Sequence, residues 1–278
     1  MLSCKEYSDQ IKKIISEEVS MLPSKPKLVV IQIGDDPASN SYVKGKEKDC
    51  AEVGFISEVL KFPNCITEKN LLEEIYELND DNSCNGIIVQ LPIPNHINVK
   101  SIQNAISPEK DVDGFNINSS FKACTPLGAI NYLKHIGYDF TGKNACVVGR
   151  SEIIGKPLAR MLLDLNATVT VCHSKTKEYN LQFQMIFSDL IFLCTNQIDY
   201  YDIKYFLEAS VDVIDFGIGR NSNGKLCGCM KKETVEKLKE CNQDNIIISG
   251  IGGTGLLTRV ALLSNTLEAY KKQIINCN

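Results

Sequence analysis

The chain has 278 residues, of which 44% are hydrophobic and 23% charged, and its formal net charge is −4. These values are typical of a soluble globular protein of two domains, and they give no reason to expect a nucleic acid partner, whose phosphates need a basic surface. No apolar run is long enough to span a bilayer, so no membrane partner is expected, and residues 1–22 predict an amphipathic helix rather than a signal peptide.

The first block of predicted elements alternates strands with helices. Its strands are expected at residues 27–34, 55–61 and 85–91, and its helices at residues 39–53 and 68–78. This alternation is typical of a parallel sheet with crossover helices, which places the chain in the α/β class.

The helix after the first strand carries the first candidates for chemistry. Ser39 is predicted to cap this helix, which places Tyr42 and Lys46 four positions apart on one face. A lysine beside a tyrosine at the mouth of a cleft can polarise a carbonyl, hold an anion or move a proton. Lys44 and Lys48 on the same helix leave open the alternative of a solvated basic surface.

Polar side chains follow the third strand. Gln90 ends a predicted buried strand, where an amide without a partner would cost roughly 1–3 kcal/mol, so a backbone or ligand partner is expected. Asp111 and Asp113 lie two apart in a loop that ends with Gly114. Both aspartates can be explained as solvated carboxylates of a turn. No metal site is predicted, because no third ligand is close.

The second block of elements follows a helical segment at residues 126–135. Its strands are predicted at 144–148, 168–172, 189–194, 211–216 and 245–249, and an amphipathic helix is predicted at 257–272. The order of elements again indicates a parallel sheet.

Twelve cysteines are scattered along the chain. Several of them, such as Cys146, Cys172 and Cys194, fall in predicted core strands, which indicates reduced, buried thiols and a cytoplasmic protein. Cys227 and Cys229 form the one close pair, but no histidine lies near them, so no zinc site is predicted.

The turn after the strand at 144–148 is the most informative pattern in the chain. The strand stops at Gly149, which allows a sharp reversal, and a helix is predicted to begin near Gly155 and Pro157 with its free N–H groups aimed at an anion. The pattern predicts dinucleotide binding, although the spacing is not the common G-x-G-x-x-G. The alternative is an ordinary strand, turn and helix in which the glycines only relieve crowding.

The end of the strand at 168–172 indicates which dinucleotide is bound. NAD sites usually place an acid about 20 residues past the glycines, but here Ser174 and Lys175 follow the strand and the first acid is Glu178. A hydroxyl and a cation, together with Arg150 in the turn, suit a 2′-phosphate better than a free hydroxyl. NADP is therefore predicted rather than NAD.

Several sequence segments, spread over almost the full length of the chain, together form a family pattern. In order, these are GDDPASNSYVKGKEKDCAEVGF, VQLPIPNHI, SPEKDVDGFN, CTPLGA, VVGRSEIIGKPLA, ATVTVCHSKT, VIDFGIGR and GGTGLLTRVALLSNTLEAY. In this order they resemble the bifunctional 5,10-methylenetetrahydrofolate dehydrogenase/cyclohydrolase (FolD-type) family. The resemblance implies two α/β domains flanking a cleft, the second a Rossmann-type NAD(P)-binding domain. It also implies oxidation of 5,10-methylenetetrahydrofolate to 5,10-methenyltetrahydrofolate with NADP, then hydrolysis to 10-formyltetrahydrofolate.

The same resemblance gives domain boundaries and an expected assembly. Residues 1–122 would form the folate-binding catalytic domain, with the C-terminal helix at 257–278 packing back on it, and residues 123–256 would form the NADP-binding domain. The substrates would be tetrahydrofolate derivatives, polyglutamylated forms included. The chain would form a homodimer through the cofactor domain.

The family's catalytic residues are carried over position by position. Lys46 matches the catalytic lysine, which handles protons and activates the hydrolytic water, and Gln90 matches the glutamine that tunes this lysine. Tyr42 matches the tyrosine that stacks on the folate. Asp113 matches the carboxylate that hydrogen-bonds the pterin ring.

The cofactor contacts are carried over in the same way. Arg150 and Ser174 match the family's contacts to the 2′-phosphate, which agrees with the missing acid after the second strand. The full set of expected cofactor positions is Gly149, Arg150, Ser151, Ile154, Gly155, Ser174, Gly217, Gly253 and Thr258.

The chain departs from the family pattern in two places. Residues 251–258 read IGGTGLLT where the family usually has PGGVGPMT, and the loss of two prolines predicts a more mobile loop and weaker cofactor binding. Residues 116–124 form a shorter connection than the family's, which predicts a more open wall of the folate cleft.

Two alternatives to the bifunctional enzyme stay open. One is a monofunctional dehydrogenase, with NAD as an alternative cofactor, and the retained Lys46 counts against it because single-activity members of the family can lack this lysine. The other is a non-catalytic folate- or nucleotide-binding protein. The intact set of four catalytic positions counts against that second alternative.

Overall fold

The computed structural model describes residues 2–206 and 211–276. The chain divides into two compact units. We call Ser8–Cys124 with Arg259–Asn278 the first unit, and Met1–Tyr7 with Thr125–Thr258 the second unit. Among the described helices, none combines the length and the apolarity that crossing a membrane requires.

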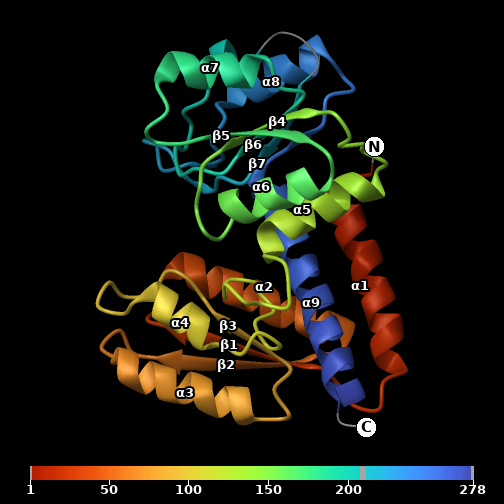
Figure 1. Cartoon of the computed structure of the whole chain (residues 1–278), viewed down its shortest axis with the longest axis vertical. Helices are drawn as coiled ribbons and strands as arrows, with labels where there is room; N and C mark the ends of the chain where they lie inside the picture. Colours follow the sequence, from red (N-terminus) through yellow and green to blue (C-terminus); the bar gives the residue numbers. More distant parts are fainter. Residues whose placement is uncertain (1, 207–210, 277–278) are drawn as a thin grey trace. The chain divides into compact units, whose positions relative to one another are not determined.

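The first unit is built on a parallel three-stranded sheet in the order β2-β1-β3 (Figure 1). The register pairs Val30 of β1 with Val59 of β2 on one side and Ile88 of β3 on the other. The strands are β1 (Lys27–Ile33), β2 (Ile56–Phe62) and β3 (Gly86–Val89). The helices are α2 (Pro37–Val53), α3 (Glu68–Asp80), α4 (Val99–Ala105) and most of α1 (Cys4–Ser20).

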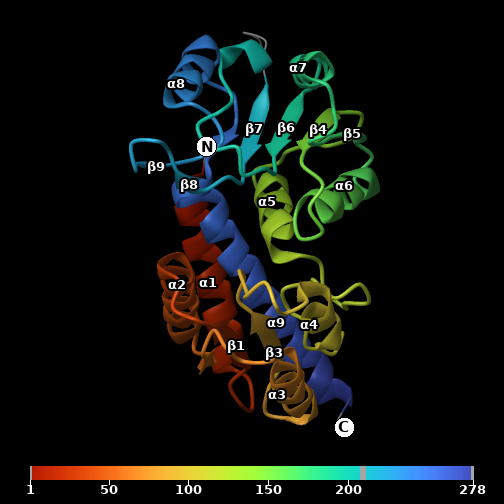
Figure 2. The ribbon, with the colours of Figure 1, turned by 90° about the vertical axis from the view of Figure 1, so that its left-hand side faces the viewer.

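Helices cover both faces of this sheet. Ile31 of β1, Leu71 of α3 and Ile102 of α4 belong to one buried cluster, so α3 and α4 pack on the same face. Val30 points to the opposite face, because side chains alternate along a strand. Both views show α2 across the sheet from α3 (Figures 1 and 2).

The second unit is built on a parallel five-stranded sheet in the order β10-β7-β6-β4-β5. The strands are β4 (Asn144–Val148), β5 (Thr168–Cys172), β6 (Leu190–Leu193), β7 (Asp212–Asp215) and β10 (Ile247–Ile248). The helices are α5 (Cys124–His135), α6 (Gly155–Asp164), α7 (Glu178–Ile186), α8 (Lys232–Cys241) and the start of α9 (Gly255–Asn276). Two short strands, β8 (Gly219–Arg220) and β9 (Leu226–Cys227), form an antiparallel hairpin.

The order of these strands creates a switch point between β4 and β6. The chain leaves β4 for β5 on one side and then returns to β6 on the other, which is the doubly wound arrangement that binds ligands at the carboxyl ends of the strands. Gly149 follows β4 at this point, and its N–H donates to the carbonyl of Cys172 (2.8 Å). The predicted phosphate turn therefore lies at the switch point.

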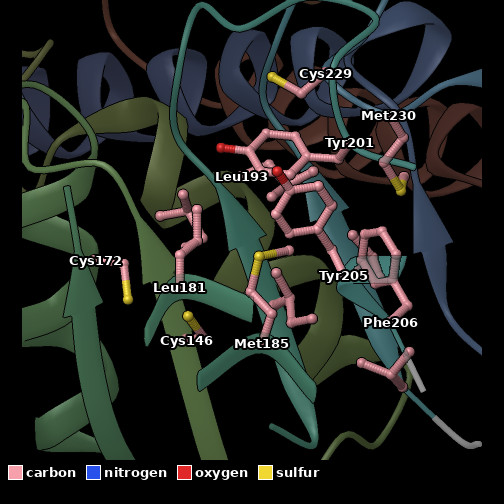
Figure 3. Close-up of a cluster of buried hydrophobic side chains, with 14 of the residues drawn as sticks. Cys146, Cys172, Leu181, Met185, Leu193, Tyr201, Tyr205, Phe206, Cys229 and Met230 are labelled. Atoms are coloured by element: carbon pink, nitrogen blue, oxygen red, sulfur yellow. The ribbon is translucent and has the colours of Figure 1, made fainter. Parts of the chain in front are cut away.

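One buried cluster of the second unit lies on the face of this sheet that α7 and α8 cover. Figure 3 shows Cys146 and Cys172 from adjacent strands beside Leu181 and Met185 of α7. Tyr201 belongs to the same cluster and is fully buried. These two cysteines act as small hydrophobic residues in a packed core.

The start of α2 differs from its prediction. The N-cap is Asp36, whose carboxylate accepts a hydrogen bond from the N–H of Ser39 (2.8 Å), and Pro37 occupies the first turn. The prediction that Ser39 caps this helix is wrong. Ser39 is instead buried inside the first turn.

The observed bounds of the other elements equal the predicted bounds in some cases and differ from them in others. The predicted strands at 144–148 and 168–172 coincide with β4 and β5. The third strand is shorter than predicted and ends at Val89, and the last helix is longer than predicted and runs from Gly255 to Asn276. No pattern in the sequence indicated α4 or the β8–β9 hairpin.

Candidate active site

Lys46 of α2 is the central residue of the candidate site. It is only 8% exposed, and its Nζ donates a hydrogen bond of 3.0 Å to Oε1 of Gln90. Gln90 follows β3, and its Nε2 donates to the carbonyl of Leu91 (2.7 Å), so its amide oxygen is held facing the lysine. The alternative of a solvated basic surface is wrong for Lys46, although Lys44 and Lys48 are exposed.

Tyr42 lies one turn before Lys46 on α2 and is 39% exposed. Partial burial raises the pKa of its phenol, and the guanidinium of Arg259 acts in the opposite direction. The phenol is therefore neutral at physiological pH. Next to the lysine, its ring presents an exposed aromatic surface on which a planar ligand can stack.

Asp111 and Asp113 differ in their surroundings. Asp111 is 1% exposed, its Oδ2 accepts from the N–H of Asn116 (2.8 Å), and burial raises its pKa to about 6. The explanation as a solvated turn carboxylate is therefore wrong for Asp111. Burial also raises the pKa of the partly exposed Asp113, while the charge of Lys46 and the thiol of Cys124 lower it. Asp113 thus belongs to the same group of side chains as Lys46.

An ion-pair network anchors α2 one turn beyond Lys46. Asp49 is 4% exposed and pairs with Nε of Arg259 on α9 (3.0 Å) and with Nζ of Lys12 on α1 (3.3 Å). Gly45 makes room for the arginine, because a Cβ there would lie 2.2 Å from Nη1 of Arg259. No local signal in the sequence connected these residues, which lie far apart along the chain.

The turn between β4 and α6 fits an anion. Gly149 has a φ of +130°, and a Cβ there would lie 2.2 Å from the carbonyl oxygen of Cys194, so the turn requires glycine. Oγ of Ser151 accepts from the N–H groups of Ile154 (3.2 Å) and Gly155 (3.3 Å), which orders the start of the helix. A glycine turn that leads into a helix N-terminus can hold a pyrophosphate.

Arg150 and Ser174 lie just past the carboxyl ends of β4 and β5, two adjacent strands, and both are exposed. The acid within the turn, Glu152, forms an ion pair with Lys156 in the first turn of α6, so its charge is offset there. A guanidinium and a hydroxyl at neighbouring strand ends suit a phosphate group.

The remaining predicted cofactor positions lie in three segments of the second unit. Gly217 follows β7. Gly253 lies in the turn Gly250–Thr254, which precedes α9 and in which Ile251 and Gly252 have non-helical dihedral angles. Thr258 lies in the first turns of α9, where its Oγ1 donates to the carbonyl of Thr254 (2.9 Å). The end of the predicted loop is therefore helical.

Two family models match the chain. The model described as tetrahydrofolate dehydrogenase/cyclohydrolase, catalytic domain, matches residues 2–113, and the model of the NAD(P)-binding domain of the same family matches residues 123–274. Among curated proteins, the bifunctional protein FolD of Bacillus cereus (strain AH187) is 41% identical, over 98% of this chain and 96% of its own length.

The chain is also similar to solved structures of this family. The bifunctional FolD enzyme from Campylobacter jejuni is 38% identical and superposes with a TM-score of 0.90, covering 98% of each chain. The FolD enzyme from Trypanosoma brucei, solved in complex with NADP cofactor and inhibitor, is 28% identical with a TM-score of 0.87, covering 99% of this chain and 98% of its own.

Proposed function

This chain belongs to the tetrahydrofolate dehydrogenase/cyclohydrolase family, and from that membership we infer that it is a bifunctional enzyme of one-carbon metabolism. It oxidises 5,10-methylenetetrahydrofolate to 5,10-methenyltetrahydrofolate with NADP and hydrolyses this product to 10-formyltetrahydrofolate. One observation carries this conclusion: the buried Lys46 donates to Gln90 at 3.0 Å, beside Asp113.

Each of the four proposed residues of the first unit has a separate role in binding or converting the folate. Lys46 activates the water that attacks the methenyl carbon. Gln90 orients the amine of Lys46. Asp113 accepts hydrogen bonds from the amino and ring N–H groups of the pterin, and Tyr42 stacks on the folate. The shared location of Lys46, Gln90 and Asp113, and the exposed ring of Tyr42 one turn away, support these roles.

NADP binds to the second unit through the nine positions expected from the sequence. Gly149 and the start of α6 hold the pyrophosphate, and Arg150 and Ser174 hold the 2′-phosphate. The steric requirement for glycine at Gly149 supports this assignment. When bound, NADP accepts the hydride, so the task of the protein there is to bind and orient it.

The proposed domains are residues 1–122 with the helix at 257–278 for folate and catalysis, and residues 123–256 for NADP. The matched ranges of the two family models, 2–113 and 123–274, support a boundary near residue 123. The substrates include polyglutamylated tetrahydrofolates. The enzyme acts in the cytoplasm, in keeping with cysteines that are free thiols throughout the described residues.

The enzyme forms a homodimer through the second unit. Large apolar side chains are exposed there on α6, β5 and α7, and β5 is an edge strand of its sheet. These side chains are Leu163, Val171, Tyr179, Phe183 and Phe187. An apolar surface beside an unpaired strand edge is typical of a subunit interface.

A spectrophotometric assay tests the function. The purified protein is mixed with 5,10-methylenetetrahydrofolate and either NADP or NAD, and the reduced cofactor and the methenyl intermediate are followed together. Reduction of NADP with little accumulation of the methenyl compound is expected. Lasting accumulation would indicate a monofunctional dehydrogenase, and no reduction with either cofactor would leave only a binding protein.

A further inference from the structure

Asp215 is a buried carboxylate to which the proposed function gives no role. It is the last residue of β7 and is 1% exposed. A carboxylate out of contact with water needs hydrogen-bond donors, because burying a charge without them is costly. Three backbone N–H groups supply these hydrogen bonds, and they come from two separate segments of the chain.

Each oxygen of this carboxylate holds one of the two segments. Oδ1 accepts from the N–H of Gly217 (2.8 Å), in the segment that follows β7. Oδ2 accepts from the N–H groups of Cys229 (2.7 Å) and Met230 (3.1 Å), in the segment that follows β9. The β8–β9 hairpin lies between these segments along the chain. Asp215 therefore ties both ends of the hairpin region to the carboxyl end of β7.

Close packing fixes the carboxylate and the segments that it holds. A Cβ at Gly228 would lie 2.4 Å from Oδ2 of Asp215. A Cβ at Gly217 would lie 2.2 Å from Sγ of Cys229. The carbonyl oxygen of Gly217 also lies 2.3 Å from the position of a Cβ at Gly250, in the turn that precedes α9. Glycine is therefore required where the two segments approach the carboxylate, and the first segment also touches the turn that carries another proposed cofactor position.

These contacts lie at the edge of the sheet where ligands bind in doubly wound folds. Strands β4, β6 and β7 are parallel neighbours, so their carboxyl ends lie at the same edge. The proposed cofactor positions Gly149 and Gly217 follow two of these strands. The place of Gly217 at this edge thus depends on the carboxylate of Asp215.

We propose that Asp215 is a positioning residue for the cofactor: its carboxylate holds the segment of Gly217 and the start of the hairpin in the shape that receives NADP. A site that is already ordered loses less conformational entropy on binding, so the carboxylate contributes to affinity. The inference rests on the proposed place of Gly217 in the cofactor site.

The test is the replacement Asp215→Asn, which keeps the size of the side chain and changes its hydrogen bonding. An amide has one accepting oxygen and an NH2 group that only donates. Whichever way the amide is turned, its NH2 group faces at least one of the three N–H groups, so one segment is released. The Kd for NADP is expected to rise about 10-fold, which is the lower end of the range for a hydrogen bond to a charged group.

Two further readouts separate positioning of the cofactor from a merely structural role. The Kd for NAD should rise by the same factor as the Kd for NADP, because β7 lies away from β4 and β5, whose ends carry the proposed 2′-phosphate contacts. The Kd for tetrahydrofolate, whose proposed contacts belong to the first unit, should be unchanged. A merely structural role would lower the thermal unfolding temperature and leave all three values of Kd of the folded protein as they are.

Asp212→Asn is the matched control. Asp212 is the first residue of the same strand, and its Oδ1 accepts from the N–H of Ile246 (2.7 Å) at the amino end of β7. The variant makes the same chemical change in the same strand, away from the cofactor edge. It should bind NADP, NAD and tetrahydrofolate like the wild type.

Three results would overturn the proposal: an unchanged Kd for NADP in Asp215→Asn, a rise for NADP alone, or an equal rise in Asp212→Asn. If Asp215→Asn does not fold, Gly228→Ala keeps the carboxylate, displaces it with a methyl group and carries the same expectation. Titrations need no turnover, so the two failures are distinguishable. A wild type that binds neither cofactor refutes the proposed cofactor site and this inference with it. A wild type that binds NADP no better than Asp215→Asn refutes this inference alone.

Discussion

Helix α2 carries three lysines at alternate positions, and only the middle one is buried. Residues two apart on a helix point in nearly opposite directions, so Lys44 and Lys48 face solvent while Lys46 faces the protein. A buried ammonium group is costly unless hydrogen bonds or opposite charges compensate it. Gln90 and Asp113 supply that compensation, and burial distinguishes Lys46, the proposed catalytic lysine, from its two solvated neighbours.

The replacement Lys46→Met should abolish the hydrolysis of 5,10-methenyltetrahydrofolate, with a loss of about 100-fold or more, because a positioned proton carrier is worth about that much. The decay of methenyl absorbance measures this rate. Lys44→Met, on the exposed face of the same helix, is the matched control and should hydrolyse like the wild type. Substantial hydrolysis by Lys46→Met would remove Lys46 from its role.

Arg150→Ala should weaken NADP binding about 10-fold or more and leave NAD binding nearly unchanged, because the proposed partner of the guanidinium is the 2′-phosphate, which only NADP carries. Titration of each cofactor into the protein gives both values of Kd. Arg160→Ala replaces another exposed arginine, within α6, and should affect neither cofactor. Equal weakening of both cofactors by Arg150→Ala would refute the 2′-phosphate assignment.

At the scale of elements, local patterns predicted the strands of the second unit well. Strands β4 and β5 match their predicted bounds because each is a short apolar run bounded by turn residues. The sequence offers two caps for the start of α2, since both Asp36 and Ser39 are residue types that cap helices. Pro37 resolves the choice, because proline favours the first helical position and thus places the cap at Asp36.

Contacts between distant parts of the chain could not be predicted in this way. Asp49, Arg259 and Lys12 are common surface residue types, and nothing local shows that they form one buried network. The same holds for Asn265 and Cys124, which look like ordinary positions on two separate helices. The sequence therefore indicates the candidate ligand contacts more readily than the residues that hold them in place.

Asp36→Ala should lower the thermal unfolding temperature of the protein, because the first turn of α2 loses the acceptor for the N–H of Ser39. Ser39→Ala should lower it less, since the backbone N–H that donates to Asp36 is retained. Circular dichroism melts measure both changes. A larger effect for Ser39→Ala would restore Ser39 as the cap.

The effect of Asp36→Ala should also depend on pH. The backbone N–H of Ser39, and then its side chain, lower the pKa of Asp36 in the folded protein. The stabilisation is therefore complete above the ordinary carboxyl pKa and is lost as the pH falls through the lowered value. The difference between the wild type and Asp36→Ala should narrow in acid, and a constant difference down to low pH would contradict the cap.

At the scale of the whole molecule, the exposed aromatic side chains of α7 and of its C-cap, Phe187, need an explanation. Phe183 and Phe187 are 58% and 62% exposed, and their ring centroids lie 4.6 Å apart. Among the described strands, β5 lies at one edge of its sheet and pairs only with β4. An edge strand flanked by exposed apolar side chains can pair with other chains and cause aggregation. Pairing with one specific partner subunit prevents this.

The double variant Phe183→Glu/Phe187→Glu should convert a dimeric wild type to a monomer, because two buried charges in the interface would repel or remain unpaired. Light scattering after gel filtration measures the mass. Tyr76→Glu, which changes an exposed aromatic residue of α3 in the first unit, is the control and should stay dimeric. A wild type that is monomeric at every concentration would refute the proposed assembly.

The two hydrogen bonds from Asn265 to the carbonyls of Val112 and Lys122 can form only late in the synthesis of the chain. Val112 and Lys122 leave the ribosome long before the amide that binds them, so these two hydrogen bonds to the loop bearing Asp113 form only when nearly the whole chain is made. A nascent chain that ends before residue 265 has all four proposed folate contacts and still lacks the group that orders one of them. The affinity for folate should therefore rise late as the chain grows, and products truncated before residue 265 should bind folate more weakly than the full chain.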